Sequence, residues 1–522
     1  MSPAAAVLFV LLVSVTLGIT FWAGKRNKSV ESHLVAKGQI TGRQNGVAIA
    51  GDFISAATFL GTTGAIAVQG YNGFYLAVYI PIAFLLTLLL IAEPLRNLGH
   101  FTLGDVLATR FRGDGVRGAI AISSIVVSLF YMVAQFVGAA LLIQLLFGID
   151  YIVAAIVIGV LTTVYTLVGG MLATTYIQIV KTGLLLFCGV VLLFFVLSKF
   201  GWSPLEVFHR VSDIQDGKFL KPARPGLAAQ FEQFSVIFGV TLGVLGLPHV
   251  MIRFLTVKDS SAARTSAVTS IWIFAGFLVI LPILSYGALL LIGDSPDFKA
   301  TAKAGGNMTM PILSEFVGGD LLLAFVSAVA FATILAALSG LVIATTGAIS
   351  HDIYGKLFRK GIVDHKQQLK VARIATFSSA VVAMLIALLV KDQNVAFLAT
   401  LAIAIAASAN LPALLFTMYS KTATAAGITW GMVAGLVTAI AIILVSPVFN
   451  PEGALIPLKS PGIISIPVGF LVTWLISLAT QPKGEAAVEA DDLFLRIRIQ
   501  ATTGIDPHDP NSLPPSQRVA SH

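Results

Sequence analysis

Residues 45–70 read NGVAIAGDFISAATFLGTTGAIAVQG, and this stretch decides the fold class. It is long enough to cross a bilayer as a helix, yet it holds one carboxylate, Asp52. An ionisable side chain inside a membrane span indicates function by default. The alternative is that Asp52 lies near the cytoplasmic surface, where it reaches water or pairs with a loop arginine. Small or polar residues crowd the same stretch, namely Gly51, Ser55, Thr58, Gly61, Thr62, Thr63 and Gly64. Together they predict a membrane helix that is broken where it lines a polar cavity.

The composition of the whole chain predicts a membrane protein. Of the 522 residues, 57% are hydrophobic and 11% are charged, whereas soluble domains carry about a quarter charged residues. Apolar side chains must therefore face lipid as well as each other. The net charge of +8 comes from Lys and Arg in short loops between apolar runs, which is typical of membrane topology rather than of nucleic-acid binding. The single cysteine, Cys188, excludes an internal disulfide and a Cys-based metal cluster.

Thirteen apolar runs are long enough to span a membrane, so the predicted fold is an all-α membrane protein of about 13 transmembrane helices. The runs are residues 3–22, 46–69, 73–93, 118–147, 151–168, 175–198, 233–252, 267–292, 318–348, 371–390, 394–418, 425–446 and 462–480.

The basic residues predict the orientation of these spans. A signal peptide carries its basic residues before its apolar core, whereas here Lys25, Arg26 and Lys28 follow the first run. We therefore expect the N-terminus outside, with most Lys and Arg of the later loops on the cytoplasmic side. An odd number of spans then places the C-terminus inside. Residues 483–522 are polar and Pro-rich, and we expect a mobile cytoplasmic tail there.

A second span, FSVIFGVTLGVLGLPHVMIRFLTVKD at 234–259, resembles the first in its density of helix-weakening residues. These residues are Gly239, Thr241, Gly243, Gly246 and Pro248. His249 and Arg253 follow on one face. We interpret Arg253 as a cytoplasmic anchor in preference to a substrate ligand. We interpret His249 as a structural hydrogen-bonding residue in preference to a proton relay. The two broken spans are five apart, as in transporters built from two inverted five-helix halves. At the breaks in such helices, the helix N-termini attract anions and the carbonyl groups of the unwound backbone hold a cation.

Polar residues in other spans are candidates for the same cavity, although Ser, Thr, Asn and Gln also serve as ordinary contacts between membrane helices. The predicted substrate-binding residues are Ser55, Thr58, Tyr131, Gln135, Thr241, Ser339, Ser408 and Asn410. The chain has no P-loop, no paired Cys or His metal spacing and no Gly-x-Ser-x-Gly elbow, so we expect neither an enzyme nor an ATP-driven pump.

From about residue 10 to 480, the sequence resembles the sodium:solute symporter family. The segments GGMLATTYIQ (169–178), GLPHVMIRF (246–254) and AISHDIY (348–354) carry the resemblance. Within that family it looks most like the bacterial cation/acetate symporters, on the strings LGITFWAGKR, NGVAIAGDFISAATFLG, AEPLRNLG, SAVAFATIL and IAIAASANLP.

The resemblance implies a LeuT-type fold with a five-plus-five inverted repeat. Its parts are a peripheral helix and loop (1–45), a transport core (46–420), two peripheral helices (421–482) and the tail (483–522). It also implies cation-coupled import of acetate and related monocarboxylates such as propionate, pyruvate and glycolate across a bacterial inner membrane. The alternatives are another small solute, such as proline or pantothenate, or a nutrient sensor. No cofactor, nucleic acid or obligatory protein partner is expected.

The resemblance also implies a sodium site between span 2 and span 9. The matching backbone positions are Gly51, Ile54 and Thr333. The family's two adjacent side-chain hydroxyls are absent, because those positions are Ala336 and Ala337. Asp52, Thr333 or Ser339 could supply oxygens instead, and otherwise the coupling ion is a proton with Asp52 as its carrier. The sequence thus leaves Na⁺ and H⁺ open.

Overall fold

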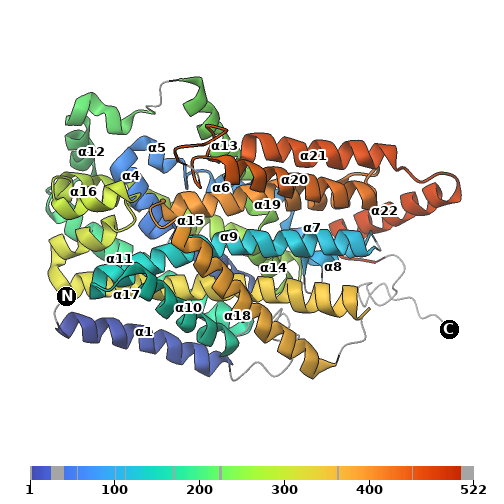
Figure 1. Ribbon diagram of the computed structural model, residues 1–522, viewed down its shortest axis with the longest axis horizontal. Helices are drawn as coiled ribbons and strands as arrows, with labels where there is room; N and C mark the ends of the chain where they lie inside the picture. The colour runs from blue at the N-terminus through green and yellow to red at the C-terminus, as the bar shows by residue number, and fades with distance from the viewer. Residues whose placement is uncertain are drawn as a thin grey trace.

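The protein is a bundle of helices whose long axis runs across Figure 1. The computed structural model describes residues 3–24, 40–55, 57–99, 102–111, 113–168, 171–222, 226–360, 364–449 and 451–506. Within these ranges there is no β-strand, and the one bridge of extended backbone joins Ile40 to Val257. The predicted all-α class is confirmed.

The helices follow one another with short connections. In the first half they are α1 (Pro3–Gly24), α3 (Gly42–Phe53), η2 (Ala57–Thr62), α4 (Thr63–Gln69), α5 (Tyr71–Phe74), α6 (Ile80–Leu90), α7 (Ala92–Leu98), α8 (Leu103–Ala108), α9 (Asp114–Phe147), α10 (Tyr151–Val168), α11 (Met171–Ser198), α12 (Pro204–Ser212) and η3 (Ile214–Leu220). In the second half they are α13 (Leu227–Gly243), η4 (Val244–Gly246), α14 (Pro248–Leu255), α15 (Ser260–Ile292), α16 (Pro296–Lys303), α17 (Thr309–Gly347), η5 (Ala348–Phe358), α18 (His365–Leu389), α19 (Val395–Tyr419), α20 (Ala425–Val445), α21 (Gly462–Ala479) and α22 (Glu485–Thr503).

Many of these helices are long and apolar enough to cross a membrane. Nine helices of the described chain qualify on their own, and two bent pairs, α3 with η2–α4 and α6 with α7, raise the number to 11. Shorter apolar helices lie at Ala6–Val15 and Tyr151–Thr163, within α1 and α10. Each of the thirteen predicted runs falls on one of these elements, so the chain is a multi-pass membrane protein.

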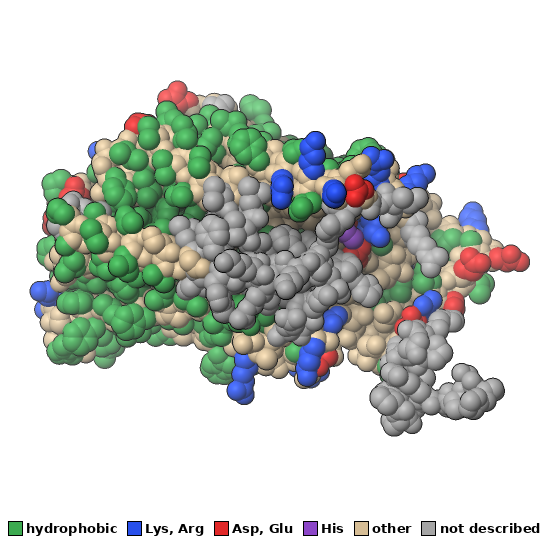
Figure 2. Space-filling view, turned by 90° about the horizontal axis from the view of Figure 1, so that it is seen from below, with side chains coloured by type: hydrophobic (Ala, Val, Ile, Leu, Met, Phe, Trp, Pro, Cys, Tyr) green, Lys and Arg blue, Asp and Glu red, His purple; other side chains and the backbone are tan. Residues whose placement is uncertain are grey.

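Burial separates an inner set of helices from an outer set. In α17 and α19, 89% and 94% of the most apolar window is buried, against 33% in α18 and α21. The outer helices expose large apolar side chains, such as Phe187, Trp272, Leu389 and Trp430. Figure 2 shows hydrophobic side chains over most of the left half of one face, with Lys and Arg mainly toward the right. Exposed apolar side chains on a folded bundle are suited to contact with lipid.

The prediction of a mobile tail at residues 483–522 is wrong for the first part of that segment. Residues 485–503 form α22, which packs against α7 at the right-hand end of Figure 1. Its Ile497 and Ala501 are buried, and Phe494 lies 4.7 Å from the guanidinium carbon of Arg110. Composition suggested disorder, but one face of this helix has apolar groups to bury. Residues 507–522 lie outside the described residues, and the division into core and peripheral parts stays a prediction.

Candidate functional site

The first broken span contains α3, η2 and α4. Helix α3 ends at Phe53, and Ile54 leaves the helical region with φ −75° and ψ 65°. Six residues of π-helix follow in η2 before the α-helix resumes. The Thr58 hydroxyl donates to the Phe53 carbonyl, so one backbone group freed by the break finds a partner. The break predicted from the glycines and hydroxyls is present.

The second broken span contains α13, η4 and α14. A short 3₁₀ turn ends at Gly246, Leu247 is extended, and Pro248 begins α14, where its missing N–H costs no helical hydrogen bond. A Cβ on Gly243 would lie 2.0 Å from the Ile403 carbonyl oxygen, so only glycine allows this approach to α19. Both breaks, η2 and η4, pack against α19. The two irregular segments therefore share a neighbour inside the bundle, as a cavity-lining arrangement requires.

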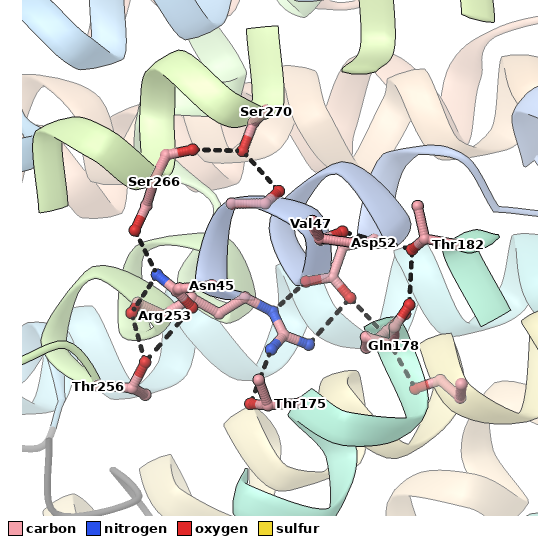
Figure 3. Close-up of polar contacts among 12 residues, drawn as sticks. Asn45, Val47, Asp52, Thr175, Gln178, Thr182, Arg253, Thr256, Ser266 and Ser270 are labelled. Carbon is pink, nitrogen blue, oxygen red and sulfur yellow. Dashed lines mark hydrogen bonds and ion pairs between the residues drawn. The ribbon is translucent and has the colours of Figure 1, made fainter. Parts of the chain in front are cut away.

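An ion pair joins the two broken spans. Arg253 of α14 donates through Nε and Nη2 to the two carboxylate oxygens of Asp52, at the end of α3. Both side chains are at least 96% buried. Gln178 of α11 donates to Asp52 Oδ1 at 2.5 Å, and Arg253 Nη1 donates to Thr175 Oγ1 at 3.3 Å. Figure 3 shows this arrangement, with the guanidinium directed at the carboxylate. The interpretation of Arg253 as a surface anchor is wrong, because its side chain is buried and paired with Asp52 inside the bundle.

Polar contacts to α15 hold the ion pair in place from the other side. Asn45 donates to the Arg253 carbonyl and to Ser266 Oγ, each at 3.1 Å. Ser270 donates to the Gly46 carbonyl at 2.9 Å, and Thr256 donates to the Arg253 carbonyl at 2.7 Å. These bonds, drawn in Figure 3, fix α3 and α14 relative to α15. A buried ion pair needs such support to offset the loss of hydration.

Lys181 of α11 is the functional candidate that the sequence reasoning missed. Its side chain is 1% exposed, and Nζ donates to the Thr333 carbonyl of α17 at 3.3 Å. We call Asp52, Arg253 and Lys181 the central charge cluster. Its formal charge is −1 for Asp52 and +1 for each of the two cations, which leaves one surplus positive charge. The signal was present, since Lys181 lies inside the apolar run 175–198 and the rule that selected Asp52 applies to it equally.

The structure brings the predicted cation-binding positions to α11. A Cβ on Gly51 would lie 2.1 Å from Thr182 Oγ1, so α3 packs closely on α11 here. On α17, the Ala336 carbonyl accepts from Gln178 Nε2 at 3.3 Å, and Thr333 accepts from Lys181. Ile54 lies at the break itself. The carbonyls of Thr333 and Ala336 that face α11 thus already meet N–H donors.

Some of the predicted substrate-binding residues surround the breaks with unused polar atoms. The Tyr131 and His249 rings are 5.1 Å apart, which places this face of α9 against α14. Gln135, one turn along α9, is fully buried, and neither of its amide atoms has a hydrogen-bond partner among the described residues. The same holds for the hydroxyl of Thr241. Buried polar atoms are ordinarily paired, so unpaired ones at a break are suited to a ligand.

Other predicted residues are used in packing. Ser408 exchanges a 2.7 Å hydrogen bond with Ser465 of α21 and donates to the Ala404 carbonyl. Asn410 donates to the Gly246 carbonyl at 2.8 Å and accepts from Ser123, so it supports the second break from α19. Ser339 is buried in α17.

The sequence matches a known protein family over most of its length. The sodium:solute symporter family matches over residues 33–435. A relative in Bacillus subtilis (strain 168), the uncharacterised symporter YwcA, is 43% identical over 515 residues, covering 97% of this chain and 99% of its own. This chain belongs to the sodium:solute symporter family.

Solved structures show the fold of this symporter. A Na⁺-coupled sialic acid symporter in a substrate-bound, outward-open state superposes with a TM-score of 0.74 at 16% identity, covering 93% of this chain and 99% of that one. A nucleobase-cation-symport-1 family transporter in a closed conformation superposes with a TM-score of 0.53 at 14% identity, covering 88% and 98%. The fold is therefore of the LeuT type, and the family and its structural neighbours are transporters, so the chain is a secondary active transporter of a small solute.

The symporter has a second ionic cluster near the end of the bundle that carries α7 and α8. Arg117 of α9 donates to Asp105 at 3.0 Å and to Asp352 of η5 at 2.9 Å, and Thr102 donates to Asp352 at 3.1 Å. His351 Nε2 lies 3.6 Å from Asp105 Oδ2. We call Asp105, Arg117, His351 and Asp352 the end cluster.

The end cluster is not suited to a metal ion, although its two carboxylates and His351 lie close enough together to hold one. Arg117 already donates to both carboxylates. Burial by itself would raise the pKa of the Asp105 carboxyl, but hydrogen bonds and charges from His351 and Arg117 outweigh burial and hold that pKa below its ordinary value. The residues therefore pair with each other and tie α8, α9 and η5 together.

Proposed function

We propose that this transporter imports acetate and related short-chain monocarboxylates, such as propionate, pyruvate and glycolate, together with a cation. The observation that carries the proposal is the surplus positive charge of the central charge cluster. A buried charge without a counter-ion is costly, so an anion of one negative charge is the ligand that balances it best. Gln135 and Thr241, whose side-chain polar atoms have no partner among the described residues, supply hydrogen bonds for a bound polar group.

The helix ends at the two breaks support the same class of ligand. η2 begins after the irregular residues that follow Phe53, and α14 begins at Pro248. Helix N-termini carry partial positive charge, and in transporters with broken helices they face anionic groups of the substrate. The branch of the family that this sequence resembles transports acetate, which is an anion of one negative charge.

Cation coupling offsets the electrical cost of importing a carboxylate against the membrane potential. Acetate is almost fully ionised at neutral pH, since carboxyl groups of this kind have a pKa near 4 to 5. Moving one negative charge inward against a negative-inside potential costs about 2.3 kcal/mol per 100 mV. One co-transported cation removes that electrical cost. We further propose that the protein lies in a bacterial inner membrane with its N-terminus outside and α22 in the cytoplasm.

Labelled acetate uptake by proteoliposomes under imposed cation gradients tests the proposal. Acetic acid also crosses lipid by itself, so protein-free liposomes under the same gradients give the background to subtract. We expect protein-dependent accumulation that unlabelled propionate, pyruvate and glycolate inhibit. Inhibition by proline or pantothenate, with no effect of monocarboxylates, would instead assign the alternative solutes. Absence of protein-dependent flux under every gradient would contradict the transport of acetate.

A further inference from the structure

Lys181 occupies the region where the family resemblance places a sodium ion. The Thr333 carbonyl, one of the predicted sodium ligands, accepts a hydrogen bond from the Lys181 ammonium at 3.3 Å. The next carbonyl toward α11, that of Ala336, accepts from Gln178 at 3.3 Å. The side chains of Ala336 and Ala337 bring no oxygen. A buried ammonium on the same carbonyl also repels a second cation. The residues present therefore do not fit a sodium ion at this place.

Asp52, the carboxylate first considered as a proton carrier, is fully engaged. Both of its oxygens accept from Arg253, and Oδ1 also accepts from Gln178. Protonation of Asp52 would leave Arg253 as a buried charge without its counter-ion. Loss of a proton from Lys181, by contrast, leaves Asp52 and Arg253 as a neutral pair. Of the groups in the central charge cluster, Lys181 is the one that can change its charge without breaking the ion pair.

We propose that Lys181 carries the coupling proton, so that this transporter is a proton symporter whose buried ammonium replaces the sodium ion of its family. This inference deepens the proposed function and rests on it. Lysine is suited to the role because its ammonium gives up a proton readily when buried, whereas arginine stays charged.

The surplus charge of the cluster provides the coupling. With Lys181 protonated, a bound monocarboxylate brings the formal charge of the cluster from +1 to 0. With Lys181 neutral, the cluster is already balanced and the same anion would be a surplus charge. The anion therefore favours the ammonium, and by reciprocity the ammonium favours the anion. The proton and the substrate therefore each strengthen the binding of the other.

The transport cycle balances in atoms and charge. On the outer side the neutral amine of Lys181 forms an N–H bond with a proton from water, and the carboxylate then binds. After the site opens to the other side, the carboxylate leaves and the ammonium returns the proton to water there. Each cycle moves one proton and one monocarboxylate anion, with no net charge. The pH gradient drives the cycle, and the membrane potential does not.

The groups around Lys181 are few. Three charged or titratable groups of the described chain act on it: Asp52 from α3, and Arg253 and His249 from α14. The ionisable residues elsewhere on the helices packed against α11 lie toward the helix ends, and are Arg43 on α3, Arg264 and Tyr286 on α15, and Glu315 and Asp320 on α17. The helical residues of α1 include none.

A substitution that keeps the charge but not the proton transfer tests the proposal. Lys181→Arg retains a positive charge but holds its proton throughout, so we expect acetate accumulation driven by a pH gradient to fall roughly tenfold or more. Exchange of labelled for unlabelled acetate at equal pH needs only the loaded carrier, so this variant should lose a much smaller share of exchange than of pH-driven uptake. Lys199→Arg changes an exposed lysine just beyond α11 in the same way and should behave as wild type. Full pH-driven accumulation by Lys181→Arg, above protein-free vesicles, would overturn the proposal.

The effect of Na⁺ on the wild-type protein gives a second readout, which tests the proton assignment even if Lys181→Arg fails to fold. In wild-type proteoliposomes at equal pH on both sides, an inward Na⁺ gradient should drive no acetate accumulation. The melting temperature of the purified protein should be the same in sodium chloride and in choline chloride, and this measurement needs no substrate. Na⁺-driven accumulation, or a Na⁺-specific rise in melting temperature, would overturn the proton assignment. Absence of all acetate flux together with no Na⁺ effect would contradict the proposed substrate and leave the assignment of the cation position supported by the melting data.

Discussion

The central charge cluster and the end cluster contain similar residues but have different roles. Each pairs a buried aspartate with an arginine from another helix. The central charge cluster has two cations for one carboxylate. The end cluster has two carboxylates for one arginine, with His351 beside them. α17 and η5 form one long span, Thr309–Phe358. This span contains both Thr333, which contacts Lys181, and Asp352 of the end cluster, so one continuous helical segment connects the two clusters.

The difference in charge between the two clusters indicates that the sign of the surplus charge determines what a buried cluster can bind. The central charge cluster is short of one negative charge and lies beside unpaired polar atoms, so it can accept an anion. The end cluster satisfies its own carboxylates through Arg117 and Thr102, and its role is to hold three elements together. Four experiments test this comparison.

The largest effect is expected at Asp52. Asp52→Asn should abolish acetate accumulation, because Arg253 becomes an unbalanced buried charge at a cost of about 3–5 kcal/mol. The measurements are proteoliposome uptake and the melting temperature of the purified variant. Asp294→Asn makes the same change at an exposed carboxylate and should alter neither. Normal accumulation by Asp52→Asn would remove the central charge cluster from the transport mechanism.

Loss of Arg117 should mainly affect stability. Arg117→Gln removes two charge-assisted hydrogen bonds and leaves Asp105 and Asp352 facing each other, which we expect to destabilise the fold by about 2–4 kcal/mol. The apparent KM for acetate should stay unchanged, because no substrate group meets this cluster. Chemical denaturation and uptake kinetics measure the two quantities. Arg210→Gln, in an exposed pair with Glu206, is the matched control and should change stability by less than about 0.5 kcal/mol.

Gln135 and Ser408 separate a ligand-binding residue from a packing residue. Gln135→Leu replaces a buried amide without partners by an apolar side chain, so stability should rise by about 1–2 kcal/mol while the KM for acetate increases. Ser408→Ala loses the hydrogen bond to Ser465, so stability should fall by about 1 kcal/mol with KM unchanged. If Gln135→Leu lowers stability and leaves KM alone, Gln135 is a packing residue like Ser408.

The smallest effect concerns the pH dependence of the end cluster. The pKa of Asp105 is held below its ordinary value in the folded protein, so its charge stabilises the fold above the unfolded pKa of about 4. That contribution should be lost as the pH falls from about 4 toward the folded pKa. The melting temperatures of wild type and Asp105→Asn should therefore converge as the pH falls below about 4. A difference that grows on acidification would contradict the pairing.

The fold was predictable from local signals. Composition determines that apolar surface faces lipid, and glycine and proline determine where a helix must break, so both broken spans were located correctly. The tail was predicted less well, because the burial of Ile497 and Ala501 depends on a partner helix, α7, that composition does not reveal.

The site was predictable only in part, because it depends on how helices face one another. Asp52 was identified as an ionisable residue within a span. Arg253 was taken for an anchor because it follows an apolar run, and its burial depends on the packing of α14 against α3, which the sequence does not reveal. Lys181 was missed although it also lies within an apolar run; its contact with the Thr333 carbonyl depends on the packing of α11 on α17, which the sequence does not reveal.

Counterflow of acetate tests the central claim most directly, namely that the buried, positively charged site carries a monocarboxylate. Proteoliposomes loaded with unlabelled acetate are diluted into a trace of labelled acetate, with the same pH and the same salts on both sides. We predict a transient overshoot of label inside the vesicles, above its equilibrium level, in wild type but not in protein-free vesicles. Passive entry of acetic acid cannot produce an overshoot. Label that only rises to equilibrium in wild-type vesicles would contradict the claim.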